Sequence, residues 1–428
     1  MADKLAVLGG SPVVPKDMIQ VWPPIDDTDR KMVLDSLEGR KLACGPNTFA
    51  FSEEFAKWNG SKNAILTNSG TAALHMCVVA CGVGAGDHVL VTSYSWSSSA
   101  TCVIHHNAIP VFVDIDFDTI NIDVDKIEAA ITPRTKAIIV VHLHGLAVNM
   151  DKVMAVARKH KLKVIEDACQ AHGAMFKGKK VGTMGDCAAF SFNQNKCLCT
   201  GEGGMFVTDN PDMLQLAQQL WSFGETATPR DSRDYHAYAL GWMYRSNDIT
   251  AALGRSQLRK MDHYFQVQCE NAAVMNQKLK GIKGLIIPTE PKDHTHNWYN
   301  YTSRIDMKAI GWTGDPKRMR DAIMKSLQAE GVPVGVWQSF ILPAMTVFRA
   351  KNAYGKGCPW SCQGAGDDVN YDPAKFPVAQ RHCDTHFGMT TPLRAPNRTN
   401  VAEKVAEAFA KVFGNIQQID PDKVLAVK

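Results

Sequence analysis

The fold is decided by the stretch SFNQNKCLCTGEGG, which covers residues 191–204 and holds one lysine, Lys196. Small, apolar and amide residues surround this lysine, and the loop behind it ends in glycines. A solvated surface would carry more charge, so an ordinary exposed lysine is the weaker interpretation. A lysine shielded from water becomes a usable nucleophile.

An acidic segment precedes this stretch at the end of a short apolar run. Val164 and Ile165 lead into EDACQAHG, residues 166–173. A carboxylate at a strand end, followed by a serine and a lysine in a glycine-bounded loop, suggests a site for pyridoxal 5'-phosphate (PLP). Lys196 would form the Schiff base, and Asp167 would raise the pKa of the pyridine nitrogen and keep it protonated. The alternative is an aspartate that only caps the next helix.

Two further segments supply groups that suit such a cofactor. The segment NSGTAAL, residues 68–74, places Ser69, Gly70 and Thr71 between a strand-like run and a helical one. Backbone N–H groups at such a helix start would bind an anion, with Ser191 as a second phosphate ligand. An ordinary N-cap is the plain alternative. Trp96, which follows a strand-like run, would cover one face of the ring unless it is simply a core aromatic.

The chain alternates apolar runs and helical patterns from residue 65 to residue 209. The predicted strands cover residues 89–92, 110–114, 137–141, 164–165, 188–191 and 205–208. Continuous apolar runs separated by helices indicate strands that are buried on both faces of a mostly parallel sheet. In such an α/β domain, ligands bind at the carboxyl ends of the strands.

The flanking regions predict an N-terminal arm and a smaller C-terminal unit. Carboxylates open a helical pattern at residues 26–37, and helical patterns return over residues 249–279. The later predictions are a half-exposed strand at 299–306, a helix at 316–330 and a long surface loop at 351–376. We therefore expect three parts, an arm over 1–45, a large α/β domain over 46–280 and a small α+β domain over 281–428.

Composition limits the class of protein. The 428 residues carry a net charge of +4 without a Lys/Arg block, which argues against nucleic-acid binding. The apolar runs have strand length, which argues against membrane spans, and the first residues do not resemble a signal peptide. Twelve cysteines include no CxxC pair, so we expect reduced thiols in a cytoplasmic protein and no metal site.

Together these segments resemble the DegT/DnrJ type of sugar aminotransferase, a family of fold-type I PLP enzymes. The resemblance runs from residue 23 to about residue 413. Its markers lie at residues 60–74, 131–138, 141–145, 166–173 and 191–204. It implies a large domain with a mostly parallel sheet of the seven-stranded type, flanked by helices, and a small α+β domain. It also implies a homodimer whose active sites are shared between subunits.

The resemblance assigns roles to individual residues. Lys196 and Asp167 would be the catalytic pair. Gln170 would contact the hydroxyl of the cofactor ring and Trp96 would stack on the ring. The phosphate would be held by Ser69, Gly70, Thr71 and Ser191.

The chain departs from the family in two segments. Residues 241–248 read GWMYRSND where the family has Gly-Tyr-Asn-Tyr-Arg. The family asparagine reaches the partner's cofactor phosphate, and Met243 cannot replace it, so Arg245 and Asn247 become candidates for that contact. Residues 296–301 read HNWYNY where the family has His-x-Trp-His-x-Tyr. They contribute three candidate substrate-binding residues, His296, Tyr299 and Tyr301.

The resemblance implies transfer of an amino group from glutamate or glutamine to a ketone on a sugar or cyclitol. Residues 5–12, LAVLGGSP, resemble the branch that acts on inososes and related cyclitols. Nucleotide-linked keto-sugars are the other acceptor class, in amino-sugar, antibiotic or surface-polysaccharide biosynthesis. The alternatives are a PLP-dependent dehydratase, an aminohydroxybenzoate-type synthase and a non-catalytic regulatory homologue.

Overall fold

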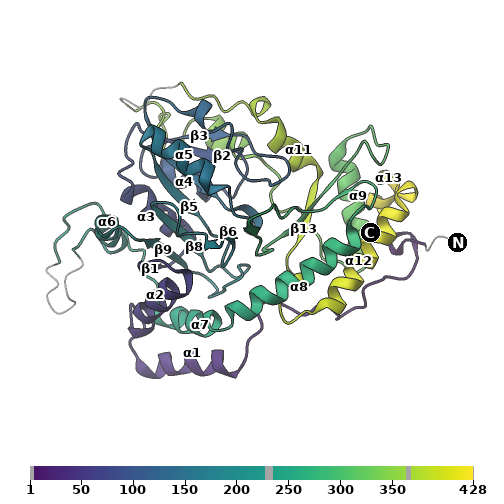
Figure 1. The fold of residues 1–428 in the computed structure, drawn as a ribbon, viewed down its shortest axis with the longest axis horizontal. Helices are drawn as coiled ribbons and strands as arrows, with labels where there is room; N and C mark the ends of the chain where they lie inside the picture. Colours follow the sequence, from purple (N-terminus) through teal and green to yellow (C-terminus); the bar gives the residue numbers. More distant parts are fainter. Residues whose placement is uncertain (1–3, 227–234, 363–367, 428) are drawn as a thin grey trace.

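A seven-stranded sheet forms the centre of the molecule (Figure 1). The computed structural model describes residues 4–226, 235–362 and 368–427. The sheet order is β1 (Asn63–Thr67), β9 (Gly204–Thr208), β8 (Cys187–Ser191), β5 (Lys163–Asp167), β4 (Thr135–Val141), β2 (His88–Thr92) and β3 (Ile109–Val113). The strands from β8 to β3 are parallel, and β9 is antiparallel to both of its neighbours. The predicted mostly parallel sheet is confirmed.

The strands are buried on both faces, as their continuous apolar runs predict. Val89 and Val91 of β2 pack into one hydrophobic core, while Leu90 between them packs into the other. In β4, Ile139 and Ile138 divide in the same way. Successive side chains of a strand point to opposite faces, so a run without polar residues fits only a sheet covered on both sides.

Helices cover the two faces of the sheet (Figure 1). One core includes residues of α3 (Gly70–Ala80), α4 (Ser98–Ile104) and α6 (Pro211–Trp221). The other core includes residues of α2 (Pro46–Asn59), α5 (Met150–His160) and α7 (Asp248–Leu258). This layered arrangement leaves the carboxyl ends of the parallel strands open for a site.

A third hydrophobic core forms beside the large sheet. Its antiparallel sheet has the order β10 (Leu285–Ile286), β12 (Tyr301–Ile305), β13 (His386–Met389). The helices that contribute to it are α8 (Met261–Leu279), α9 (Pro316–Ala329), α12 (Thr399–Gly414) and α13 (Pro421–Ala426). Leu5 and Val7 from the start of the chain belong to the same core. The division at residues 45 and 280 stays a prediction.

Shorter elements complete the fold. The first helix is α1 (Asp27–Gly39), and the carboxylate of Asp26 caps it by accepting from the backbone N–H groups of Thr28 and Asp29. The remaining short elements are β6 (Met175–Phe176), β7 (Lys179–Lys180), β11 (His294–Thr295), α10 (Thr346–Arg349) and α11 (Pro377–Thr385). Among the described residues, no helix combines the length and apolar character that crossing a membrane requires.

The helical patterns expected at 249–279 are confirmed as two helices, α7 and α8, with a turn between Leu258 and Met261. Two other sequence-based expectations need correction. The predicted half-exposed strand at 299–306 is buried throughout β12. The predicted surface loop at 351–376, whose residues 363–367 lie outside the described part, packs Trp360 and Tyr371 into the core beside β3.

Candidate active site

A cavity of about 430 Å³ opens at the carboxyl ends of the parallel strands. It brings together most of the residues that the sequence singled out as candidates. Those that line it are Ser69, Gly70, Thr71, Trp96, Asp167, Gln170, Ser191, Lys196 and Tyr299. Residues from four strand ends and from the small sheet's side of the molecule therefore meet at one place.

Lys196 is held in a defined loop. Its backbone N–H donates to the carbonyl of Asn193 at 2.8 Å, and its own carbonyl accepts from Nε1 of Trp22 at 3.0 Å. Its Nζ lies 3.5 Å from Oη of Tyr299 and 4.8 Å from the centre of that ring. A cation over an aromatic face is attracted by the ring quadrupole, so Tyr299 helps to orient the amine.

Arg394 fixes the surroundings of this amine. Its Nη1 donates to the carbonyl of Asn195 at 2.8 Å, and its Nη2 donates to the carbonyl of Tyr299 at 3.0 Å. The guanidinium is buried, with 1% exposure. Two neighbours of Lys196 are thus held by one planar group whose donors have a rigid geometry. No sequence pattern pointed to Arg394, because it lies almost two hundred residues away from this loop along the chain.

Asp167 is the last residue of β5 and lies almost fully buried at the base of the cavity. Its Oδ2 accepts from Oγ of Ser99 at 2.7 Å, and its Oδ1 accepts from the backbone N–H of Cys169 at 3.2 Å. The sequence reasoning missed Ser99. The available signal was the run of hydroxyl residues at 93–99, which follows β2 at the same edge of the sheet.

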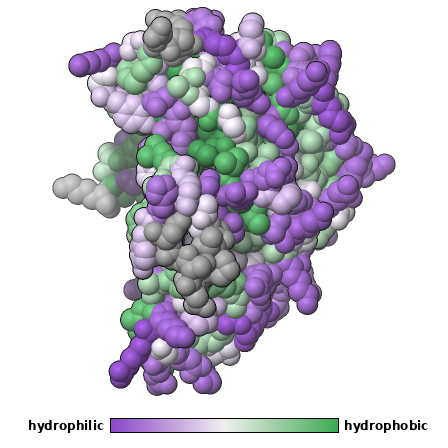
Figure 2. Space-filling model, turned by 90° about the vertical axis from the view of Figure 1, so that its left-hand side faces the viewer, coloured by the Kyte–Doolittle hydropathy of each residue, from purple (hydrophilic) through white to green (hydrophobic). Residues whose placement is uncertain are grey.

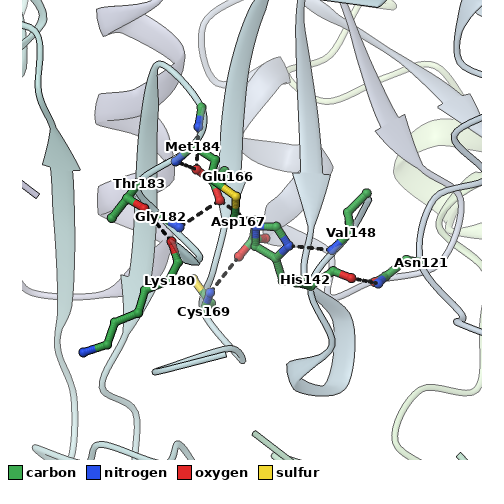
Figure 3. Close-up of polar contacts among 12 residues, drawn as sticks. Asn121, His142, Val148, Glu166, Asp167, Cys169, Lys180, Gly182, Thr183 and Met184 are labelled. Atoms are coloured by element: carbon green, nitrogen blue, oxygen red, sulfur yellow. Dashed lines mark hydrogen bonds and ion pairs between the residues drawn. The ribbon is translucent and has the colours of Figure 1, made fainter. Parts of the chain in front are cut away.

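Glu166, the residue before Asp167, anchors the end of β5 through its carboxylate (Figure 3). Oε2 of Glu166 accepts from Nε2 of His142 at 2.9 Å and from the N–H of Gly182 at 2.8 Å. Its Oε1 accepts from the N–H groups of Met184 and Gly185. Burial alone would raise the pKa of Glu166, but these hydrogen bonds and the nearby His142 outweigh it and lower the pKa.

His142 has one defined tautomer. Its Nδ1 accepts from the backbone N–H of Val148 at 3.0 Å, so the ring proton lies on Nε2 and points to Glu166 (Figure 3). The backbone N–H of His142 donates to the carbonyl of Asp167 at 3.1 Å. The ends of β4 and β5 are therefore joined both by the sheet and by side chains.

A cradle for an anion forms where α3 begins. Ser69 caps the helix, and its Oγ accepts from the N–H of Ala72 at 3.1 Å. A Cβ on Gly70 would lie 2.7 Å from Cβ of Ser191, so only glycine allows this close approach. The first N–H groups of a helix have no partner within the helix and carry its positive end. The hydroxyls of Thr71 and Ser191 complete a donor set that suits a phosphate.

Two aromatic side chains and an amide line the remaining wall. Trp96 is 55% exposed, and its ring centre lies 6.4 Å from that of Trp337, a residue that the sequence reasoning missed. Oε1 of Gln170 accepts from the backbone N–H of His144 at 2.8 Å, which fixes the direction of the amide. A lysine, a buried carboxylate, an anion cradle and a flat aromatic wall in one cavity fit PLP.

Four predicted residues do not line this cavity. His296 stacks on Trp298 with ring centres 4.1 Å apart, and burial lowers its pKa to about 3. Tyr301 is buried and donates from Oη to Asn276 at 2.8 Å. Both face packed protein, because β12 and the turn before it are covered on both sides.

The other two residues lie in the segment that departs from the family. Arg245 packs against the ring of Phe223, with its guanidinium carbon 5.1 Å from the ring centre. Asn247 is exposed and caps α7 by accepting from the N–H of Thr250 at 2.9 Å. Neither lines the cavity.

Known proteins resemble the chain in sequence and in fold. It is 36% identical to the L-glutamine:2-deoxy-scyllo-inosose aminotransferase of Streptomyces lividus, over 71% of this chain and 74% of that protein. It is 39% identical to the GDP-perosamine synthase of Caulobacter vibrioides, over 72% of this chain and 81% of that protein. The solved structure of 3-amino-5-hydroxybenzoic acid synthase superposes with a TM-score of 0.80 at 27% identity, covering 93% of this chain and all of that one.

The model of one family matches residues 23–370, which is most of the chain. This match includes the lysine loop, the Asp167 segment and the anion cradle. The chain belongs to the DegT/DnrJ/EryC1/StrS aminotransferase family, whose enzymes use pyridoxal phosphate.

Proposed function

We propose that this enzyme transfers an amino group from glutamate or glutamine to a ketone on a polyhydroxylated ring, either a cyclitol or a sugar. One observation carries the proposal. Lys196, Asp167 and the anion cradle line a single cavity, and they offer the amine, the carboxylate and the anion donors that suit a cofactor with an aldehyde, a ring nitrogen and a phosphate.

When bound, PLP supplies an electron sink for the carbon that gains or loses the amino group. Nζ of Lys196 would hold the cofactor and would serve as the base that takes the proton from the substrate carbon or returns it. The carboxylate of Asp167 would keep a proton on the ring nitrogen. The N–H groups at the start of α3, with Ser69, Thr71 and Ser191, hold the phosphate end. Trp96 covers one ring face.

The substrate class follows from the relatives and from the wall of the cavity. The relatives named above act on an inosose or, by their name, make a perosamine linked to GDP. The side chains of Ser95, Asn193 and Asn195 line the cavity and offer hydroxyl and amide groups. Such groups pair with the hydroxyls of a ring substrate. We therefore propose a neutral keto-cyclitol or a keto-sugar as acceptor.

We also propose a homodimer with shared active sites. Figure 2 shows a face with hydrophobic residues at the surface, on the side of the molecule where α6 lies. The segment after α6 exposes Phe223, Leu240 and Met243, at 42%, 77% and 52%. Arg245 and Asn247, which do not reach their own cavity, would contact the cofactor phosphate of the partner.

The cysteines carry no disulfide in the described part of the chain, which supports a cytoplasmic location.

Replacing the lysine tests the cofactor assignment. We expect Lys196→Ala to abolish turnover and the visible absorbance of the lysine-bound cofactor, because no other amine in the described residues lines the cavity. Borohydride reduction of the natural protein should fix the cofactor to the peptide that contains residue 196, as read by mass spectrometry. Lys179→Ala, an exposed lysine on β7, is the matched control and should behave as the natural protein. Full activity in Lys196→Ala would refute the proposal.

Product analysis separates amino transfer from the competing chemistry. The purified enzyme would be given scyllo-inosose-type ketones or nucleotide-linked keto-sugars, with glutamine or glutamate as donor. Nitrogen from a labelled donor in the ring product supports transfer. The likeness to 3-amino-5-hydroxybenzoic acid synthase makes water loss without nitrogen transfer the main alternative outcome.

A further inference from the structure

A chain of two serine hydroxyls ends on the carboxylate of Asp167. Oγ of Ser99 donates to Oδ2 of Asp167 at 2.7 Å, and Oγ of Ser95 lies 2.8 Å from Oγ of Ser99. Both serines are buried, with exposures of 0% and 1%. Ser95 lines the cavity, whereas Ser99 lies behind it at the start of α4. The chain therefore runs from the cavity wall to the back of the carboxylate.

The direction of these hydrogen bonds is fixed by chemistry. A carboxylate can only accept, so the single hydroxyl proton of Ser99 points to Asp167. The oxygen of Ser99 can then only accept from Ser95, so the proton of Ser95 points to Ser99. Ser95 consequently presents acceptor lone pairs alone to the cavity. Each bond polarises the next, and this strengthens the donor that reaches the carboxylate.

No stronger partner holds Asp167 within the described residues. No lysine, arginine or histidine forms an ion pair with it there, and Cys169 supplies its other contacts, through the backbone N–H at 3.2 Å and through the thiol. The nearby thiols of Cys102 and Cys169 stay protonated, because burial raises the pKa of each. The hydroxyl chain is thus the main side-chain contact that stabilises the negative charge of this carboxylate.

We propose that Ser99 is a positioning residue for the cofactor and that Ser95 supports it. A hydrogen bond donated to the carboxylate lowers its attraction for a proton, so the proton shared with the ring nitrogen stays on the nitrogen. Ser99 on Oδ2 and the backbone N–H of Cys169 on Oδ1 together fix the orientation of the carboxylate. This inference rests on the proposed function, since it needs a cofactor whose ring nitrogen meets Asp167.

Three serine variants in one segment give a graded test. In Ser99→Ala the carboxylate becomes a stronger base and the ring nitrogen loses positive charge. We expect the pH midpoint of the visible absorbance of the lysine-bound cofactor to rise by about one unit, and kcat/KM to fall about tenfold. Ser95→Ala should also raise the pH midpoint and lower kcat/KM, but by less than Ser99→Ala, because Ser99 keeps its hydrogen bond to Asp167. Ser97→Ala is the control, since its side chain makes no capping hydrogen bond on α4.

The pH midpoint of the visible absorbance is the deciding measurement, because a loss of packing alone would lower stability without moving this pH midpoint. The thermal midpoint and the Kd of the cofactor-free protein for PLP would be measured for each variant. If Ser99→Ala does not fold, the shift in Ser95→Ala decides. Equal pH midpoints of the visible absorbance in the natural protein, in Ser95→Ala and in Ser99→Ala would overturn the inference and leave the proposed function intact. Failure of borohydride to link PLP to Lys196 in the natural protein would instead overturn the proposed function.

Discussion

At the scale of single residues, Glu166 is a buried carboxylate that pairs with no arginine or lysine in the described part of the chain. Its charge is stabilised by hydrogen bonds from three backbone N–H groups and from Nε2 of His142. Burying a carboxylate without such donors costs several kcal/mol, so the contacts must all be present in the folded state. Because Asp167 is the next residue, the same contacts fix the base of the site.

Replacing this carboxylate with an amide should unfold the enzyme more easily. In Glu166→Gln one oxygen becomes an NH₂ group, which then faces N–H donors instead of accepting from them. We expect a loss of about 3 kcal/mol in the free energy of unfolding, measured by guanidinium denaturation. Glu403→Gln on the exposed face of α12 should change it by less than about 0.5 kcal/mol. Equal losses in the two variants would contradict this account.

The sequence predicted residues whose type already suggests the chemistry. Lys196 in a glycine-bounded loop and Asp167 at a strand end are of this kind, and both line the cavity. Ser99, Arg394 and Trp337 reach the same place only through the fold, and their residue types are common in unrelated roles. His296 and Tyr301 were carried over from a family segment, but here they face packed protein.

At the scale of elements, α2 and α7 pack closely at a point where α7 has a glycine. Gly254 of α7 lies against Phe51 of α2, where a Cβ would come within 2.7 Å of Cζ of the ring. Phe51 is fully buried and cannot move away. The sequence could not reveal this contact, nor the break between α7 and α8. Arg259 and Lys260 are not helix breakers, so the helical pattern continues through them.

A methyl group at this position sets two opposing effects against each other. Alanine gains about 1 kcal/mol of helix propensity over glycine, whereas overpacking a rigid core costs typically 1–3 kcal/mol. We expect Gly254→Ala to lower the free energy of unfolding by about 1 kcal/mol, as measured by denaturant titration. Gly39→Ala in α1 meets no atom within 4 Å and should raise it by up to about 1 kcal/mol. A higher free energy of unfolding in both variants would show that α2 and α7 can move apart to accept the added methyl group.

At the scale of the whole molecule, buried histidines link stability to pH. Burial is the largest cause that lowers the pKa of eight of them, and the pKa falls to about 3 for His75, His172 and His296 and to about 4 for His106 and His386. These rings bind protons near pH 6.5 when the chain unfolds, but not in the folded protein. Between these values the unfolded state binds more protons, so stability is lost as the pH falls.

Unfolding experiments at several pH values test this dependence. Each such histidine contributes about 1.4 kcal/mol per pH unit between its folded pKa and 6.5. We expect the denaturant midpoint to fall steeply from pH 6.5 to pH 4.5 and to change little between pH 7 and pH 8. His172→Phe places a ring against Phe190 and Phe192. The variant should make the free energy of unfolding less dependent on pH, by an amount that corresponds to about one proton. A midpoint that does not depend on pH below 6.5 would contradict the buried neutral state.

The loop that carries Lys196 is completed from both ends of the chain. Trp22 donates to its backbone, and Arg394 holds the neighbouring Asn195. During synthesis the first of these residues leaves the ribosome early and the second near the end. A growing chain that has reached residue 280 contains the whole central sheet and the start of α3, yet lacks the arginine that fixes the loop. The cradle for the phosphate therefore needs only residues that are made before Arg394, whereas the lysine loop also needs Arg394 itself.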